Sequence, residues 1–230
     1  MIWLPLAACV HRAPAPIAPP VATALPGPTG YHPLIPVAVA PTERARLGSD
    51  TAPWVILEFS DFECPHCAAT YLKLSGYVAQ RPDVKLIYRD YPISNQCNPR
   101  VDAVRHEHAC AAARAGLCAD QQGRFDALAR KMFANQAYLA DTDLALMAAA
   151  ADLDVDAFGR CVVSADTNAA LLREVEQGIN TGILGTPTLY VWGPWGPTWT
   201  RVDDADGVIA AIDAAIDHQS LAAPEADRAY

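Results

Sequence analysis

A pair of cysteines stands where a strand-like run ends and a helix-like run begins. The run Trp54–Ser60 is apolar and rich in β-branched residues, and Cys64-Pro65-His66-Cys67 follows it closely. Apolar residues then recur at helical spacing, and Pro65 suits the first turn of that helix, where its missing N–H has no helical partner anyway. A second strand-like run, Val84–Tyr88, comes next. Strand, helix and strand in this length predict a βαβ unit with two parallel strands.

The rest of the chain divides into a helical stretch and a second part that contains strands. Residues 99–182 show helical periodicity without a convincing strand. Strands are expected again at Thr188–Trp192 and Trp199–Val202, followed by a last amphipathic helix and a polar tail at 221–230. We therefore expect an α/β fold in the order β-α-β, helical insertion, β-β-α, with an all-α inserted subdomain.

Several residues have expected local environments. Ser164 and Thr142 are expected to cap helices. One helical face is expected to carry Leu144, Met147, Ala148 and Ala151, and another Leu171, Leu172, Val175 and Ile179. Three tryptophans near the last strands could line a peptide groove, although we expect them to cover a sheet edge: Trp192, Trp195 and Trp199.

The first forty residues have a different composition. The chain opens with an apolar stretch that ends in Leu6-Ala7-Ala8-Cys9, which resembles the bacterial lipobox with its lipidated cysteine. Residues 1–9 are short for a signal and lack Lys and Arg, so we expect the true start upstream; a chance apolar terminus is the alternative. Nine prolines in residues 10–41 exclude a helix or central strand and predict a disordered, extended tether.

The charge balance narrows the classes of partner. The chain has 17 Lys and Arg against 26 Asp and Glu, which gives a net charge of −9. This argues against nucleic acid as a partner, because nucleic-acid binding uses a basic surface. It also argues against attachment to anionic lipid by charge. With no run of 18 apolar residues, membrane attachment is expected only through a lipid on Cys9.

The position of Cys64 predicts redox chemistry. At a helix N-terminus, unpaired N–H groups and the helix dipole stabilise a thiolate, and two intervening residues bring Cys67 within bonding distance. His66 can add positive charge or a hydrogen bond, which makes the Cys64 thiolate a better leaving group. A structural disulfide is one alternative, and a zinc site is another. The zinc site would take further ligands from three candidates: His106, His108 and Cys110. Of these, His106 and Cys110 are expected on one helical face.

Three segments together resemble the DsbA-like branch of the thioredoxin superfamily. They are VILEFSDFECPHC (55–67), the helical insertion, and GTPTLYVWG (185–193). The resemblance spans about residues 35–218 and implies a thioredoxin-like fold, with a first half at 42–98, the insertion at 99–182 and a second half at 183–220. The CPHC motif is the one associated with strongly oxidising members.

The resemblance also implies roles for residues outside the motif. Glu58 corresponds to a buried acid beneath the cysteines and is expected to tune proton transfer to and from Cys67. Pro187 is expected to face the cysteine pair at the head of a strand, after a cis Thr186–Pro187 peptide bond. Thr186 is expected to contact substrate, whose extended chain would pair with the backbone there.

Four cysteines remain: Cys97, Cys110, Cys118 and Cys161. An even number in an exported chain suggests two structural disulfides. Cys110 and Cys118 would lie about 12 Å apart along one helix, beyond disulfide reach. We prefer Cys97–Cys110 with Cys118–Cys161, while Cys97–Cys118 with Cys110–Cys161 stays open, as do free thiols in a cytosolic protein.

These observations lead to a functional expectation. We expect an extracytoplasmic thiol:disulfide oxidoreductase, most simply a dithiol oxidase that transfers the Cys64–Cys67 disulfide without a bound cofactor or metal. The resemblance implies reduced or misoxidised exported proteins as substrates, a membrane quinone-linked redox partner, and a monomer lipid-anchored in the periplasm. The alternatives are a membrane-anchored disulfide reductase of the same fold and a copper- or zinc-handling thioredoxin-like lipoprotein.

Overall fold

The computed structural model describes residues 36–222, with side chains up to residue 218, and this part is built around one sheet. The elements are β1 (Trp54–Ser60), α1 (Pro65–Val78), β2 (Val84–Asp90), α2 (Ala109–Gln121), α3 (Phe125–Ala134), α4 (Asp141–Ala150), α5 (Val155–Val162), α6 (Ala165–Thr181), β3 (Thr188–Trp192), β4 (Thr200–Val202) and α7 (Ala205–Ala222). The predicted α/β order, with an all-helical insertion of α2–α6, is therefore confirmed. The segment 1–9, with the predicted lipidation site Cys9, lies outside the described residues.

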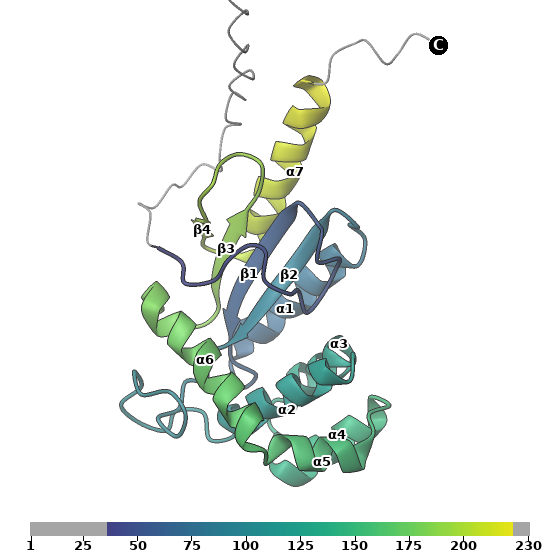
Figure 1. Cartoon of the computed structure of the whole chain (residues 1–230), viewed down its shortest axis with the longest axis vertical. Coiled ribbons are helices and arrows are strands. Elements are labelled where there is room, and N and C mark those ends of the chain that lie inside the picture. The colour runs from purple at the N-terminus through teal and green to yellow at the C-terminus, as the bar shows by residue number, and fades with distance from the viewer. Residues whose placement is uncertain (1–35, 223–230) are drawn as a thin grey trace, which may run out of the picture.

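The four strands lie in the order β2-β1-β3-β4. β1 and β2 run parallel, with Trp54 opposite Val84, as a βαβ unit requires. β3 is antiparallel to β1 and places Thr188 opposite Phe59, so the start of β3 lies beside the end of β1. In Figure 1 the insertion gathers at the lower end of the sheet and α7 lies at its upper end. The end of β1 thus meets both the insertion and the loop before β3.

Alternating side chains of the strands form two cores, one on each face of the sheet. Ile56, Leu86 and Val191 belong to the larger core, which also takes in α1, α7 and much of the insertion. Leu57 and Tyr190, from the opposite face, belong to a second cluster with residues near the end of α6. Successive side chains of each strand point alternately into one core and then the other. Both faces of the sheet are therefore covered, which explains why β1 and β2 are buried along their whole length.

The folded part begins earlier than expected. The tether was predicted to run through residues 10–41, but Val39 is only 2% exposed and packs in the second core. Its carbonyl accepts a hydrogen bond from Trp199 Nε1 at 2.8 Å, and Ala38 N donates to Thr181 Oγ1 at 3.0 Å. Two prolines, Pro36 and Pro41, flank a segment that packs without helical or strand hydrogen bonds, which composition alone could not reveal.

Two disulfides tie the insertion together. Cys97 joins Cys110, which closes the loop that leads into α2, and Cys118 joins Cys161, which connects α2 to α5. These are the preferred pairs from the sequence. The third cluster of buried apolar residues forms around the first disulfide and includes Leu171 and Val175 of α6.

A buried arginine joins the insertion to the sheet. The Arg46 side chain is 3% exposed and its guanidinium lies 2.5 Å from Glu174 of α6, 3.3 Å from Asp90 of β2 and 3.9 Å from Asp120 of α2. It also stacks over the Phe125 ring, 4.7 Å from the centroid. One cation thus lies within ion-pair distance of acidic side chains from three elements that are far apart in sequence.

Two local expectations within the insertion were wrong. Thr142 lies inside α4, whose N-cap is Ala140 and has no side-chain cap, although Asp141 and Asp143 in its first turn complement the helix dipole. Leu172 is 44% exposed, because α6 packs its Leu171 and Val175 side inward and turns Leu172 away. Ser164 does cap α6, where its side chain accepts a hydrogen bond from Thr167 N.

The three tryptophans lie at the end of the sheet away from Cys64. Trp192 pairs with Val55 at the start of β1, Trp195 packs on Trp54 with ring centroids 5.1 Å apart, and Trp199 joins the second core. They cover the sheet around the β3–β4 turn, as we preferred, and the peptide-groove interpretation is not supported. Within residues 36–222, no helix combines the length and apolar character needed to cross a bilayer.

Candidate active site

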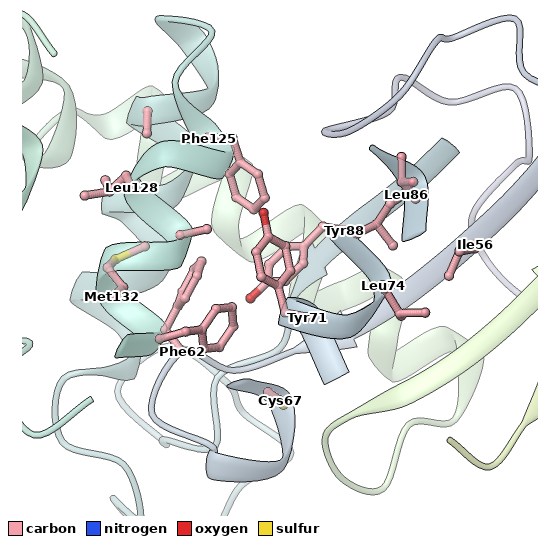
Figure 2. Close-up of a cluster of buried hydrophobic side chains, with 14 of the residues drawn as sticks. Ile56, Phe62, Cys67, Tyr71, Leu74, Leu86, Tyr88, Phe125, Leu128 and Met132 are labelled. Atoms are coloured by element: carbon pink, nitrogen blue, oxygen red, sulfur yellow. The ribbon is translucent and has the colours of Figure 1, made fainter. Parts of the chain in front are cut away.

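Cys64 and Cys67 occupy the first turn of α1. Cys64 is the N-cap residue with extended backbone angles, Pro65 follows at the start of the helix, and Cys67 is completely buried one turn further on. Both cysteines are free thiols in this structure. Figure 2 shows Cys67 in the first turn of the helix that also carries Tyr71 and Leu74, close to the aromatic cluster around Phe62 and Tyr88. Both cysteines are buried, and Cys64, at 6% exposed, keeps only a small accessible surface.

The two thiols have opposite acidities. The pKa of Cys64 is lowered from 9.0 to about 5, first because the Cys67 thiol can donate a hydrogen bond to the Cys64 thiolate, with burial opposing and backbone N–H groups of the first turn adding to the effect. Burial raises the pKa of Cys67 far above the ordinary range, and the Cys64 and Glu58 charges add to that rise. Cys64 is thus the stabilised thiolate and Cys67 the protonated thiol.

Glu58 lies beneath the cysteines, as the resemblance implied. It has no exposed surface, and neither carboxylate oxygen has a hydrogen-bond partner among the described residues. Burial raises its pKa from 4.5 to about 8, with the neighbouring Ser60 hydroxyl acting in the opposite direction and the Cys64 thiolate adding to the rise. A carboxyl that holds its proton near neutral pH is a suitable proton donor and acceptor for a buried thiol.

The loop before β3 closes the site from the other side. The Thr186–Pro187 peptide bond is cis, as expected, and Cys64 Sγ lies 3.4 Å from the carbonyl oxygen of Thr186. The loop is held from behind, because Tyr91 Oη donates to the Ile183 carbonyl at 3.2 Å. Thr186 and Pro187 therefore flank Cys64 and leave its sulfur between the helix N-terminus and a backbone segment.

The His66 side chain is exposed at the rim of the site. The contribution of this residue to the lowered pKa of Cys64 comes from its backbone N–H. The role of its imidazole, as positive charge or hydrogen-bond donor, therefore stays a prediction.

The candidate zinc ligands are not assembled with the cysteine pair. Cys110 is bonded to Cys97, and His106 Nδ1 lies 2.9 Å from Asp61 Oδ2. α2 begins only at Ala109, so His106 precedes it, and the expected helical face shared by His106 and Cys110 was wrong. Among residues 36–222 there is no group of three or more His, Cys, Asp or Glu side chains that could hold a metal ion.

Two residues of the site were missed at the sequence level. Gln136, after α3, donates from Nε2 to the carbonyls of Phe62 at 2.7 Å and of Cys64 at 2.9 Å. Asp61 is 1% exposed, and its backbone N–H points to Cys67 Sγ at 3.5 Å. A polar residue directly after a buried strand was a signal for Asp61, but nothing in the sequence marks Gln136, which lies more than seventy residues from its partners.

The fold and this site together define a class, the thiol:disulfide oxidoreductases of the thioredoxin superfamily. A reactive thiolate at a helix N-terminus, a buried partner thiol and a cis-proline loop over the sulfur are arranged on a four-stranded sheet. A family model described as "Thioredoxin" matches residues 40–195, and the chain belongs to this family.

Solved structures share the fold. A thioredoxin-like oxidoreductase from Silicibacter pomeroyi DSS-3 is 23% identical, with a TM-score of 0.61 over 79% of this chain and 96% of its own. The catalytic domain of Proteus mirabilis ScsC is 20% identical, with a TM-score of 0.58 over 76% and 92%. The oxidoreductase DsbA from Xylella fastidiosa is 20% identical, with a TM-score of 0.55 over 75% and 89%. The predicted DsbA-like form of the fold is thus confirmed.

Curated relatives include a much larger protein. The Na(+)/H(+) antiporter NhaA 3 of Salinispora tropica is 27% identical over 157 residues, which are 68% of this chain and 23% of the antiporter. The chain thus spans about a quarter of the length of the curated relatives it matches.

Proposed function

We propose that the chain is a dithiol oxidase that donates the Cys64–Cys67 disulfide to other proteins. The observation that carries the proposal is the acidity of Cys64, whose pKa is lowered to about 5 at the N-terminus of α1. A stabilised Cys64 thiolate favours the reduced enzyme, so the oxidised enzyme passes its disulfide on readily. The reaction needs only the two sulfur atoms, so we propose no bound cofactor.

The exchange takes place in two steps. A substrate thiolate attacks Cys64 Sγ of the enzyme disulfide, the Cys64–Cys67 bond breaks, and Cys67 leaves as a thiolate that takes up a proton. A second substrate thiolate then attacks the substrate sulfur of the mixed disulfide and expels the Cys64 thiolate. The substrate loses two electrons and gains a disulfide, and the enzyme ends as a dithiol.

Glu58 is suited to supply the proton in the first step. Its pKa is raised to about 8, so it is protonated near neutral pH, and its charge affects the pKa of Cys67 directly. After the transfer, a carboxylate without a hydrogen-bond partner is left buried, which favours return of the proton when the disulfide forms again.

The mechanism is tested with Cys64→Ser in the full chain. Oxidation of a dithiol peptide by the oxidised enzyme should be lost, while a Cys118→Ala/Cys161→Ala variant should keep it, since that disulfide lies in the insertion. Dithiol oxidation that persists in Cys64→Ser would contradict the mechanism.

The direction of transfer is tested by the reduction potential in a glutathione buffer. A value of about −120 mV supports the oxidase. A value of about −270 mV would instead support the second candidate function, a disulfide reductase. Replacement of His66 should lower the potential, because a stabilising group for the thiolate is removed. An unchanged potential would remove the proposed role of the His66 imidazole.

For the setting we propose an extracytoplasmic one, the periplasm of a bacterium with a lipid anchor at Cys9. Two disulfides in the insertion support an oxidising compartment. The proposed substrates are reduced or misoxidised exported proteins, and reoxidation is assigned to a membrane quinone-linked partner. We propose a monomer, and sedimentation of the full chain with detection of lipid on Cys9 tests both points.

A further inference from the structure

A buried aspartate connects three parts of the chain beside the cysteines. The Asp61 carboxylate has no exposed surface and accepts three hydrogen bonds. Oδ1 accepts from Glu63 N at 2.8 Å, while Oδ2 accepts from Ile93 N at 2.6 Å and from His106 Nδ1 at 2.9 Å. The donors come from the active-site loop, the segment after β2 and the start of the insertion.

The backbone of the same residue contacts both cysteines. Asp61 N donates to Cys67 Sγ at 3.5 Å, and Asp61 O accepts from Cys64 N at 3.0 Å. The orientation of the Asp61 peptide groups is therefore linked to the position of its carboxylate. Any group that holds the carboxylate also holds the loop that places the two sulfurs.

His106 is the only side chain among these three donors, and its segment is held in place independently. His108 N donates to Glu63 Oε2 at 2.7 Å, so a second contact joins this segment to the active-site loop. The Cys97–Cys110 disulfide closes the loop that carries both histidines. The imidazole of His106 is partly accessible, with 26% of its side chain exposed.

The charges around His106 favour its protonated form. The hydrogen bond to Asp61 raises the pKa of His106, burial opposes this rise, and the charges of Glu63 and the Cys64 thiolate add to it. On its own segment, Arg105 is paired with Asp102 and both are exposed, while Glu107 lies exposed beside it. Because the coupling is mutual, an imidazolium here also favours the Cys64 thiolate.

We propose that His106, bound to Asp61, is a positioning residue of this site: its imidazolium fixes the active-site loop and stabilises the Cys64 thiolate from outside the Cys64–Cys67 motif. The proposal rests on the proposed function only in taking Cys64 as the reacting sulfur. It assigns the start of the helical insertion a part in the redox equilibrium that acts through Asp61 and is separate from the exposed His66.

The test is a pH titration of the Cys64 thiolate in the reduced full chain, followed by its ultraviolet absorbance. His106→Ala should raise the midpoint by about one pH unit, a tenfold change in thiolate formation. His106→Lys, which restores a cationic donor, should return the midpoint most of the way. His108→Ala is the matched control, because only the backbone of His108 contacts the site, and it should titrate like the wild type.

An unchanged midpoint in His106→Ala would overturn the proposal, and so would equal shifts in His106→Ala and His106→Lys. The redox equilibrium with glutathione provides the second readout, and His106→Ala should favour the disulfide several-fold more than the wild type does. The titration involves no substrate, so it separates failure of this proposal from failure of the oxidase function. A wild-type chain with a reductase-like potential could still show the full His106 effect.

Discussion

Cysteines and buried polar side chains have different environments at the active-site end of the sheet and in the helical insertion. In the insertion all of the cysteines are disulfide-bonded, whereas Cys64 and Cys67 at the head of α1 are free. Buried side-chain atoms without a hydrogen-bond partner show the same contrast. Within residues 36–218, no such unpaired atom belongs to α2–α6. Near the cysteines, each of three residues has at least one unpaired atom: Glu58, Ser60 and Tyr88.

The contrast teaches that environment, not residue type, decides what a cysteine does here. Cys64 lies at a helix N-terminus, where the Cys67 thiol and backbone N–H groups stabilise its thiolate. Cys118 lies within α2, surrounded by apolar residues, and serves to join helices. Four of the seven buried side-chain atoms without a hydrogen-bond partner among the described residues belong to Glu58, Ser60 and Tyr88, and the other three to Asp90, Ser94 and Trp195.

The largest expected effect comes from removing the buried acid. Between its ordinary pKa of 4.5 and its folded pKa of about 8, Glu58 ionises in the unfolded chain but keeps its proton in the folded one. The wild type should therefore lose stability as the pH rises through this window, by up to about 5 kcal/mol. Glu58→Gln should abolish that part of the pH dependence. The free energy of unfolding is measured with urea at about pH 5 and pH 9 in both proteins. If it changed with pH by the same amount in the wild type and in Glu58→Gln, Glu58 would not be buried as a protonated acid.

Removal of either disulfide should lower stability, and removal of only one of them should also affect the active site. By loop-closure entropy, Cys118→Ala/Cys161→Ala should lower the free energy of unfolding by about 4 kcal/mol and Cys97→Ala/Cys110→Ala by about 3 kcal/mol. Only the second pair closes the loop that carries His106. We therefore expect the Cys64 thiolate titration to change in that variant alone, and a change in the Cys118–Cys161 variant would weaken the separation between the two regions.

A smaller effect is expected where α6 packs behind the cis-proline loop. A Cβ at Gly178 would lie 2.4 Å from the Tyr91 ring, and Tyr91 holds the Ile183 carbonyl. Gly178→Ala should lower the free energy of unfolding by about 1–3 kcal/mol and also slow dithiol oxidation. Gly76→Ala in α1 is the control, because no atom lies within 4 Å of its added Cβ; it should gain up to about 1 kcal/mol. Equal stability of the two variants would contradict this packing argument.

Most of the fold and the reacting residues could be predicted from local patterns. β1 and β3 begin and end at the predicted residues, because their apolar runs are bounded by polar residues and turns. The N-cap of α6 was predicted at Ser164, whose side chain caps the helix, whereas the N-cap of α4, Ala140, has no capping side chain and was missed. Periodicity also failed at Leu172, since a helix face is decided by what packs against it.

The supporting contacts of the site could not be predicted in the same way. Gln136 reaches the Cys64 carbonyl and His106 reaches Asp61 only after the insertion has folded back onto the active-site loop. Such polar contacts across 45 or more residues leave no periodic trace in the sequence. The early start of the folded part at Val39 belongs to the same category, because its carbonyl and side chain find partners in distant segments.

The buried guanidinium of Arg46 restricts which chimeras between members of this family can fold. Its carboxylate partners, Asp90, Asp120 and Glu174, come from β2, α2 and α6, so the charge balance is shared between the sheet and the insertion. A buried ion left without its partner is strongly destabilising. A chimera that grafts another relative's insertion onto this sheet must therefore carry matching acids at positions 120 and 174. The insertion is an integral part of this domain, and its sequence can diverge at those positions only together with residue 46.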